Sequence, residues 1–346
     1  MAKRILAIVG HDSLEYNRIK LFKSLGYEVL TTGVYSTPEK TYKERPYLPK
    51  ADLNISDDIK EEYFRLNPGG YVYGKNRLNL SKEFLDKFDA VAISWIIQPY
   101  IDYFNILKDK VVTYESLGQS DGGRERALQQ LRNRGNLKLI RISQAERNFP
   151  LYAGDDAIID LEIDGDYFNN WNGKEEYALT INSAASSRVR ECNWPIYLQV
   201  MQGLPHRLYG TGNENLMKES YCYGTVSRDE LLKKYQEARM FFSLGTKPCP
   251  IVLSIKEAFA VGTPVITWGP RLGGGATYSA YSFIENGVNG FYSDNVVELK
   301  GYCKLLLNDY DLAKKMSIAS RKTGLKHFDF KVIQPKWAAL FNSLGV

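Results

Sequence analysis

The sequence contains no apolar run of the length that crossing a membrane requires. A membrane-spanning helix needs roughly 18 to 20 consecutive apolar residues, and no stretch of this chain approaches that length. The amino terminus leads directly into a strand-like run at Arg4–Val9 instead of a charged and then apolar cleavable signal. We therefore expect a soluble, cytoplasmic protein with no integral membrane contact.

Histidine and cysteine are also scarce. The chain has three histidines and four cysteines, and the cysteines lack the paired spacing of zinc sites and disulfide frameworks: Cys192, Cys222, Cys249 and Cys303. We expect reduced thiols. Asp164 and Asp166 form an acidic pair of the kind that binds metal in some enzymes, but they lie in the predicted connection between two domains. The sequence therefore predicts no metal site and no required cofactor.

The chain is long enough for two domains, because its 346 residues are 44% hydrophobic. Strand-like apolar runs alternate with helical patterns throughout, which favours an α/β fold with parallel sheets. The predicted strands are Arg4–Val9, Glu28–Thr32, Ala90–Ser94, Val111–Tyr114, Leu137–Ile142, Tyr177–Asn182, His206–Tyr209, Met240–Ser243, Val265–Trp268 and Gly290–Tyr292. We expect Rossmann-like domains at residues 1–165 and 166–328, then a helix at 329–346 with Trp337 and Phe341 on one side.

Positive charge is unevenly distributed. The formal net charge is +5, and the segment from Arg124 to Arg147 carries seven basic residues against Glu125 and Glu146. Two interpretations stay open: a solvated helix face, or a surface for an anionic acceptor that includes Arg132 and Arg134. The segment Thr37–Tyr73, rich in proline, tyrosine and charge, has no clear period and is typical of an irregular insertion that binds an acceptor.

The stretch from Gly245 to Pro270 indicates a ligand site. It contains a loop, Pro250 as a helix start, a helix with Glu257, and a Gly-Thr-Pro turn at 262–264 before a strand. A helix start offers unpaired backbone N–H groups and the positive end of a dipole to a phosphate. A carboxylate about two turns further along the helix can accept hydrogen bonds from a pair of sugar hydroxyls. Together these features predict a pocket for a sugar nucleotide.

This stretch resembles the donor signature of the retaining glycosyltransferases of family 4, which have the GT-B fold. The family pattern is Glu, seven residues, Glu-Ala, and then Gly-x-Pro-Val-Ile; this chain keeps Glu257-Ala258 and Gly262–Ile266. It has Cys249 where the family has the first glutamate. The resemblance implies two Rossmann-like domains, with the final helix crossing back to the first.

Two further motifs follow the family order. Gly210 lies in a Gly-x-Gly turn after a strand, and Thr225 and Val226 belong to a segment that resembles the Gly-x-Val motif near the donor base. Arg188 has the place of the arginine that neutralises the donor diphosphate. The usual lysine is absent because Asn193 stands near its position, so Arg190 is a candidate for the second charge.

The first half carries a weaker set of candidates. Gly10 and His11 follow the first strand, where enzymes of this fold bring a loop against the donor or the acceptor, although neighbouring polar residues serve equally as a helix cap. Family members with a catalytic-site histidine carry it after a later strand. This chain has Glu115 there.

The resulting hypothesis is a retaining transfer of one hexose or pentose from a nucleoside diphosphate sugar, expected to be UDP-linked, to an acceptor hydroxyl. The candidate acceptors are a glycan, a small glycoside and a hydroxymethylated base of DNA. A non-catalytic sugar-nucleotide-binding protein and a GT-B epimerase are the alternatives. The replacement of the family glutamate by Cys249 predicts an altered donor preference, such as a pentose, or recognition of the sugar by the backbone N–H groups of Ile251 and Val252 and by the loop at Gly273. A shifted helix start, with Lys247 in the role of the glutamate, is the alternative.

Overall fold

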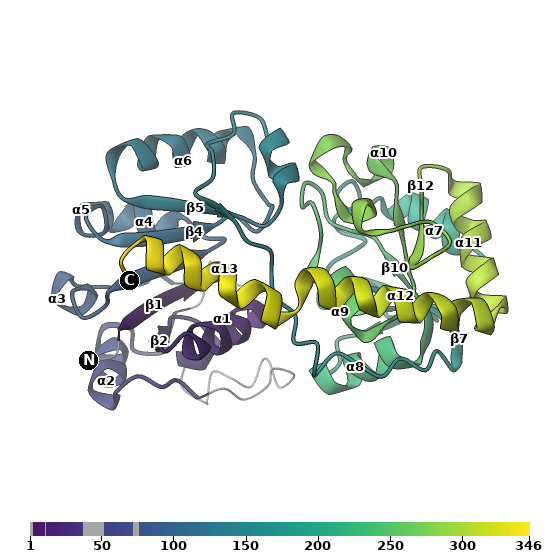
Figure 1. The fold of residues 1–346 in the computed structure, drawn as a ribbon, viewed down its shortest axis with the longest axis horizontal. Coiled ribbons are helices and arrows are strands. Elements are labelled where there is room, and N and C mark those ends of the chain that lie inside the picture. Colours follow the sequence, from purple (N-terminus) through teal and green to yellow (C-terminus); the bar gives the residue numbers. More distant parts are fainter. Residues whose placement is uncertain (1–2, 11, 37–51, 72–75) are drawn as a thin grey trace. The chain divides into compact units, whose positions relative to one another are not determined.

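A computed structural model describes residues 3–10, 12–36, 52–71 and 76–346. The chain divides into two compact units, one of Met1–Asp160 with Gln334–Val346 and one of Leu161–Ile333. Each unit is built around its own parallel six-stranded sheet, with helices between successive strands (Figure 1). The predicted boundary after residue 165 lies in the same connecting stretch as this division. The predicted α/β class with two Rossmann-like parts is confirmed.

The sheet of the N-terminal unit has the order β2-β1-β3-β4-β5-β6. Its strands are β1 Arg4–Val9, β2 Glu28–Thr31, β3 Ala90–Ser94, β4 Val111–Glu115, β5 Leu137–Arg141 and β6 Ala157–Ile158. The helices are α1 Asp12–Ser24, α2 Asp57–Leu66, α3 Lys82–Leu85, α4 Gln98–Asp102, α5 Phe104–Leu107 and α6 Gly122–Arg134, with short 3-10 turns η1 Val34–Ser36 and η3 Gln144–Asn148. The central strands β1 and β3 are almost entirely buried, as expected of a parallel sheet covered on both faces.

The last helix, α13 Phe330–Ser343, returns to the N-terminal unit. The ring of Trp337 packs edge-on against Phe22 of α1 with centroids 5.9 Å apart, and Phe341 packs against Tyr27 at 5.5 Å. The side chains of Trp337 and Phe341 are both fully buried. This apolar face is the one that the amphipathic pattern predicts, and the crossing of the last helix is confirmed.

The sheet of the C-terminal unit has the order β12-β11-β10-β7-β8-β9. Its strands are β7 Glu175–Ile181, β8 His206–Tyr209, β9 Cys222–Gly224, β10 Ala238–Ser243, β11 Val265–Trp268 and β12 Gly290–Ser293. The helices are α7 Trp194–Met201, α8 Arg228–Glu237, α9 Leu253–Val261, α10 Pro270–Gly273, α11 Val296–Asn308 and α12 Tyr310–Phe328, with 3-10 turns η4 Glu214–Leu216, η5 Gly275–Thr277 and η6 Ala280–Phe283.

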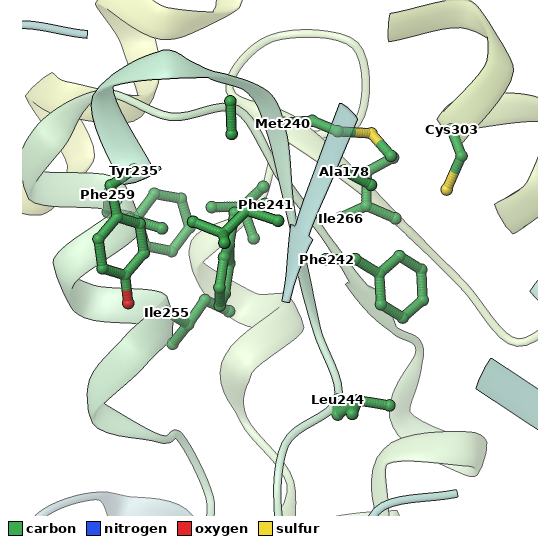
Figure 2. Close-up of a cluster of buried hydrophobic side chains, with 14 of the residues drawn as sticks. Ala178, Tyr235, Met240, Phe241, Phe242, Leu244, Ile255, Phe259, Ile266 and Cys303 are labelled. Carbon is green, nitrogen blue, oxygen red and sulfur yellow. The ribbon is translucent and has the colours of Figure 1, made fainter. Parts of the chain in front are cut away.

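Strand β10 forms the centre of this unit's core, and all six of its residues are buried. Successive side chains point to opposite faces of the sheet. Phe241 points toward Tyr235, Ile255 and Phe259, while Phe242 points to the side where Cys303 lies (Figure 2). The face of α9 that carries Ile255 and Phe259 is thereby fixed against the sheet, which sets the direction of the rest of that helix.

Candidate functional site

The strand order of the C-terminal unit reverses between β7 and β10. From β7 the chain proceeds to β8 and β9 on one side, and then returns to place β10 on the other side of β7. In open α/β sheets, ligands bind outside the carboxyl ends of the strands at such a reversal. Three segments meet there, namely 182–193 after β7, 244–252 after β10 and 269–278 after β11. Two surface hollows of this unit are lined by other residues, around Leu305 and around Trp171.

Hydrogen bonds between side chains and backbone hold these segments together. Asn182 donates from Nδ2 to the carbonyl oxygen of Gly245 at 3.0 Å, which links the end of β7 to the end of β10. Gly210, at the end of β8, has a φ of +137°, and a Cβ there would lie 2.2 Å from the Asn182 carbonyl oxygen. Only glycine permits this approach. The predicted donor residue Gly210 therefore shapes the backbone beside the site.

The N-terminus of α9 faces this region with its first backbone N–H groups unprotected by a cap. Helix α9 begins at Leu253, and its N-cap residue is Val252, which makes no capping hydrogen bond through its side chain. Valine is among the poorest N-cap residues because it offers no acceptor. A nine-residue helix with an apolar N-cap leaves its first N–H groups to solvent or to an anionic ligand.

The helix starts three residues later than the sequence predicts. Pro250 is not its first residue, because the Pro250 carbonyl oxygen accepts from the N–H groups of Ser279 and Ala280 at 3.0 and 3.1 Å. These bonds hold Pro250 against the segment after β11, and Val252 has an extended conformation with ψ of 157°. Ile251 is 1% exposed and packs into the core. Of the three predicted donor-binding residues Pro250, Ile251 and Val252, only Val252 stands at the helix start.

Glu257 lies on α9 beyond the helix start and is half-buried. The hydroxyl of Tyr235 lies 2.9 Å from Glu257 Oε2 and 3.0 Å from the Ser254 carbonyl oxygen, so its one proton serves both acceptors. Burial raises the pKa of Glu257, while Arg228 and the Tyr235 hydrogen bond oppose that rise. Because Oε2 is held by Tyr235, the second carboxylate oxygen is the one positioned to accept from a ligand hydroxyl.

Arg188 lies in the segment after β7. Its Nη2 donates to the Ser183 carbonyl oxygen and lies 3.4 Å from Asn182 Oδ1. Its Nε is buried and has no hydrogen-bond partner among the described residues. A buried unpaired donor is unfavourable by roughly 1 to 3 kcal/mol, which a bound anion would relieve. Arg190, the other predicted cation, is exposed.

Cys249 is buried, and its thiol lies 3.3 Å from the Ile251 carbonyl oxygen. The thiol is therefore used within its own loop. Thr225 is exposed, and Val226 packs at the edge of the core. Both residues directly precede Ser227, whose hydroxyl and the Glu230 side chain form a capping box at the start of α8. Because Thr225 and Val226 follow β9 directly, they lie at the carboxyl ends of the strands, as the other donor candidates do.

The three site residues predicted in the N-terminal unit, Gly10, His11 and Glu115, differ in their surroundings. Gly10 lies beside Ile96, where a Cβ would approach Ile96 Cδ1 to 2.1 Å, so the loops after β1 and β3 depend on glycine for their approach. His11 lies outside the described residues. Glu115 is 1% exposed and accepts from Arg18 Nε at 3.0 Å and from the Ser94 hydroxyl at 2.8 Å. Its contacts are those of a buried structural ion pair.

The basic segment is largely paired within its own unit. Arg132 donates to the Ala153 carbonyl oxygen at 3.0 Å and pairs with Asp156 at 2.8 Å. The Arg134 guanidinium lies over the Phe104 ring at 4.9 Å. Arg141, which belongs to the same segment, is buried in an ion pair with Glu125. These contacts leave less free positive charge than the sequence suggests.

The acidic pair near residue 165 has other partners. Asp166 forms an exposed ion pair with Lys331 at 3.2 Å, and Asp164 Oδ1 accepts from the backbone N–H groups of Asp166 and Tyr167. In the described part of the chain, no group of three or more potential metal-ligating side chains is found. In the same part, no helix has both the length and the apolar character needed to cross a membrane.

Lys247 and Asn193 are side chains at this site to which the sequence assigns no phosphate contact; Lys247 enters there only as an alternative partner of the donor sugar. Lys247 Nζ lies 2.8 Å from Asn193 Oδ1, and Asn193 Nδ2 donates to the Leu272 carbonyl oxygen at 2.6 Å. The sequence contains two signals for them: position 193 lacks the family lysine, and a lysine stands in the Gly-Thr-Lys-Pro loop. Only the fold shows that these two positions meet.

Solved structures of similar fold include glycosyltransferases. They include sucrose-phosphate synthase from Thermosynechococcus elongatus, with 13% identity, 99% of each chain covered and a TM-score of 0.68. HepE of Anabaena, solved with UDP and glucose, has 15% identity, covers 98% of this chain and 99% of its own, and has a TM-score of 0.68. A glycosyltransferase from Rickettsia africae has 15% identity, covers 99% and 98%, and has a TM-score of 0.63.

Comparison of the sequence finds no match, whereas comparison of the fold does. No protein-family model matches the chain, and no curated protein sequence matches it. At 13 to 15% identity over nearly the whole chain, the likeness establishes the fold. The chain has the GT-B fold, with two parallel six-stranded sheets and a last helix that returns to the first unit.

Proposed function

We propose that this protein is a retaining glycosyltransferase that uses a nucleoside diphosphate sugar, with a UDP-linked sugar as the expected donor. One observation carries the proposal. At the strand reversal of the C-terminal unit, the uncapped start of α9 and the unpartnered Arg188 Nε lie on loops that Asn182 joins, and Glu257 follows on the same helix. This is a set of anion donors with a hydroxyl acceptor beside it.

In this proposal the donor binds to the C-terminal unit. The diphosphate lies at the start of α9 with Arg188 beside it, and Glu257 accepts from the ribose hydroxyls. Thr225 and Val226 contribute to the place of the base. The complexes of HepE with UDP and UDP-glucose support a nucleotide-sugar donor for this fold. The N-terminal unit, with Gly10 and His11, would serve the acceptor.

The chemistry requires stabilisation of the charge that grows on the leaving diphosphate. The bond from the anomeric carbon to the phosphate oxygen breaks, and its electron pair leaves with the diphosphate. The acceptor oxygen bonds to the same carbon from the same face and gives its proton to a phosphate oxygen. Fixed guanidinium and helix N–H groups stabilise this developing charge. No protein base is needed for that step, which is consistent with a Glu115 that is held by Arg18.

For the acceptor we propose a hydroxyl of a glycan or a small molecule. The pairing of Arg132 with Asp156 and of Arg141 with Glu125 favours this choice over DNA, because these cations are already neutralised. Binding to DNA through phosphates would weaken steeply with salt. Salt-dependent binding of hydroxymethylated DNA, reduced by changing Arg132 and Arg134 together to Ala, would reverse the choice.

The proposal is tested by incubating the protein with UDP-sugars and a panel of acceptors and measuring release of free UDP. Release that requires an acceptor, gives a glycoside with the anomeric configuration of the donor, and is lost in Arg188→Ala is the expected result. Tight nucleotide-sugar binding without release would identify a binding protein. Interconversion of the sugar without an acceptor would identify an epimerase.

A further inference from the structure

Lys247 occupies a central place among the three loops of the candidate site. It lies two residues after Gly245, in the segment after β10, and its backbone N–H donates to the Glu191 carbonyl oxygen at 3.0 Å. Its ammonium reaches Asn193 Oδ1 at 2.8 Å. A Cβ on Gly274 would lie 3.4 Å from Lys247 Cγ, so the glycine-rich segment after β11 runs along the lysine side chain. Backbone and side chain are therefore both fixed.

The charge of Lys247 has a neutral partner. The Lys247 side chain is half-buried, its ammonium donates to an amide oxygen, and Glu191 acts on it electrostatically without forming an ion pair among the described residues. Burial lowers the pKa of Lys247 and outweighs the opposing electrostatic influence of Cys192 and Glu191. A half-buried cation whose direct hydrogen-bond partner is neutral is stabilised when an anion binds beside it.

Asn193 is shaped to hold this lysine. It has a left-handed backbone conformation, with φ of 51° and ψ of 39°, and its side chain does not cap α7 although it stands at the N-cap position. The side chain instead accepts from Lys247 and donates to the Leu272 carbonyl oxygen at 2.6 Å. One asparagine thus joins the segments after β7, β10 and β11.

Arg188 belongs to the same network. Asn182 Oδ1 lies 3.4 Å from Arg188 Nη2, and Asn182 Nδ2 donates to the Gly245 carbonyl oxygen at 3.0 Å. Arg188 and Lys247 are therefore connected through one asparagine and two residues of backbone. A pair of cations on joined loops suits two linked phosphates.

We infer that Lys247 supplies the second positive charge for a nucleoside diphosphate, in place of a lysine at position 193, and that Asn193 is its positioning residue. This inference rests on the proposed function and specifies its phosphate site. It moves the second cation from Arg190, which is exposed, to a different loop. The positive charge that is absent at position 193 is supplied by Lys247, which is 54 residues away in the sequence.

The test compares binding of UDP, GDP, ADP and TDP, and of the matching nucleosides, by calorimetry and by ligand-observed NMR. For the diphosphate that the protein binds most tightly, we expect Lys247→Gln to weaken affinity at least about tenfold and to leave nucleoside affinity within about twofold. Lys247→Arg should retain most of the affinity. Asn193→Ala should weaken diphosphate binding selectively and by less. Lys304→Gln, on the exposed face of α11, is the matched control and should change neither.

Two failures are distinguishable. Wild-type protein that binds a nucleoside diphosphate while Lys247→Gln retains full affinity would overturn this inference and leave the proposed function standing. Equal losses of nucleoside and diphosphate affinity in Lys247→Gln would also overturn it, because they would show a general disturbance of the loops. Wild-type protein that binds none of the four diphosphates would overturn the proposed function itself.

Discussion

The hydroxyl of Tyr235 lies 2.9 Å from Oε2 of Glu257, across the interface between α8 and α9. This bond turns one carboxylate oxygen toward the protein and leaves the other for a ligand. It also gives Glu257 a fixed orientation, which a half-buried carboxylate on a helix would otherwise lack. Tyr235 is buried and packs on Phe241 of β10, so the orientation depends on the core.

We predict that Glu257→Ala weakens binding of the nucleotide donor by about 1 to 3 kcal/mol, because charge-assisted hydrogen bonds to the ribose are lost. Tyr235→Phe should give a smaller loss, since it removes only the orientation. Calorimetry on folded variants measures both, with Glu285→Ala on the exposed surface as the control. Unchanged donor affinity in a folded Glu257→Ala variant would contradict the ribose assignment.

The raised pKa of Glu257 predicts a pH dependence of donor binding. Burial disfavours the carboxylate, so the folded protein takes up this proton at a higher pH than the unfolded chain does. The contribution of Glu257 to stability is therefore present at low pH and is lost as the pH rises through the raised pKa. Donor binding needs the carboxylate and should weaken as the pH falls through the same pKa. A titration of affinity should show this step in wild type and lack it in Glu257→Gln.

Most of the strands could be predicted from the sequence because apolar residues with a clear limit mark them. Val265–Trp268 and His206–Tyr209 have the predicted bounds, and both are parallel strands within a sheet. The sequence does not predict strand β9, Cys222–Gly224, because three residues with an exposed tyrosine give no apolar run. The predicted start of α9 is too early because the hydrogen bonds from Ser279 and Ala280 to Pro250 come from a distant segment.

The site was predictable to a smaller extent. Glu257 and Arg188 stand out because motifs surround them, and motifs are local in sequence. The pairing of Lys247 with Asn193 depends on two loops that only the strand order brings together. Likewise, nothing local indicates that Glu115 is taken by Arg18, which is 97 residues away. Burial and partners of charged side chains are tertiary properties and cannot be derived from spacing.

The missing cap of α9 makes a prediction in which stability and binding change in opposite directions. Val252→Thr keeps the side-chain shape and adds an oxygen that accepts from the first N–H groups of the helix. It should raise the free energy of unfolding by about 0.5 to 1 kcal/mol and weaken diphosphate binding, because the cap competes for the same donors. Val252→Ala leaves the donors free and serves as the control. Denaturant unfolding and calorimetry decide the matter; a stabilised variant with full affinity would move the phosphate elsewhere.

Arg188 should act more on the charge that grows during transfer than on the charge already present in the donor. We predict that Arg188→Ala lowers kcat at saturating donor by about 10² or more. Arg188→Lys should recover part of the loss, because the charge remains while the planar guanidinium is lost. Steady-state kinetics with varied donor measure both constants. A raised KM with intact kcat would show that Arg188 only binds the donor.

The donor sugar itself provides the last prediction. A glutamate at position 249 would offer two charged oxygens to sugar hydroxyls, whereas the Cys249 thiol is a weak partner and is already bonded to the Ile251 carbonyl oxygen. The charged contacts of such a glutamate to hexose hydroxyls are therefore missing, so either the donor has a different hydroxyl pattern or the sugar is recognised by backbone N–H groups of Ile251 and Val252 and by the loop that begins at Gly273. We expect a donor with a different hydroxyl pattern, such as a pentose, to be turned over faster than UDP-glucose. Cys249→Ser, which keeps a small polar group, should leave the order of donors unchanged. Turnover of a panel of nucleotide sugars is the measurement, and a wide lead of UDP-glucose over every pentose and deoxy-sugar donor would show that Cys249 does not determine sugar choice.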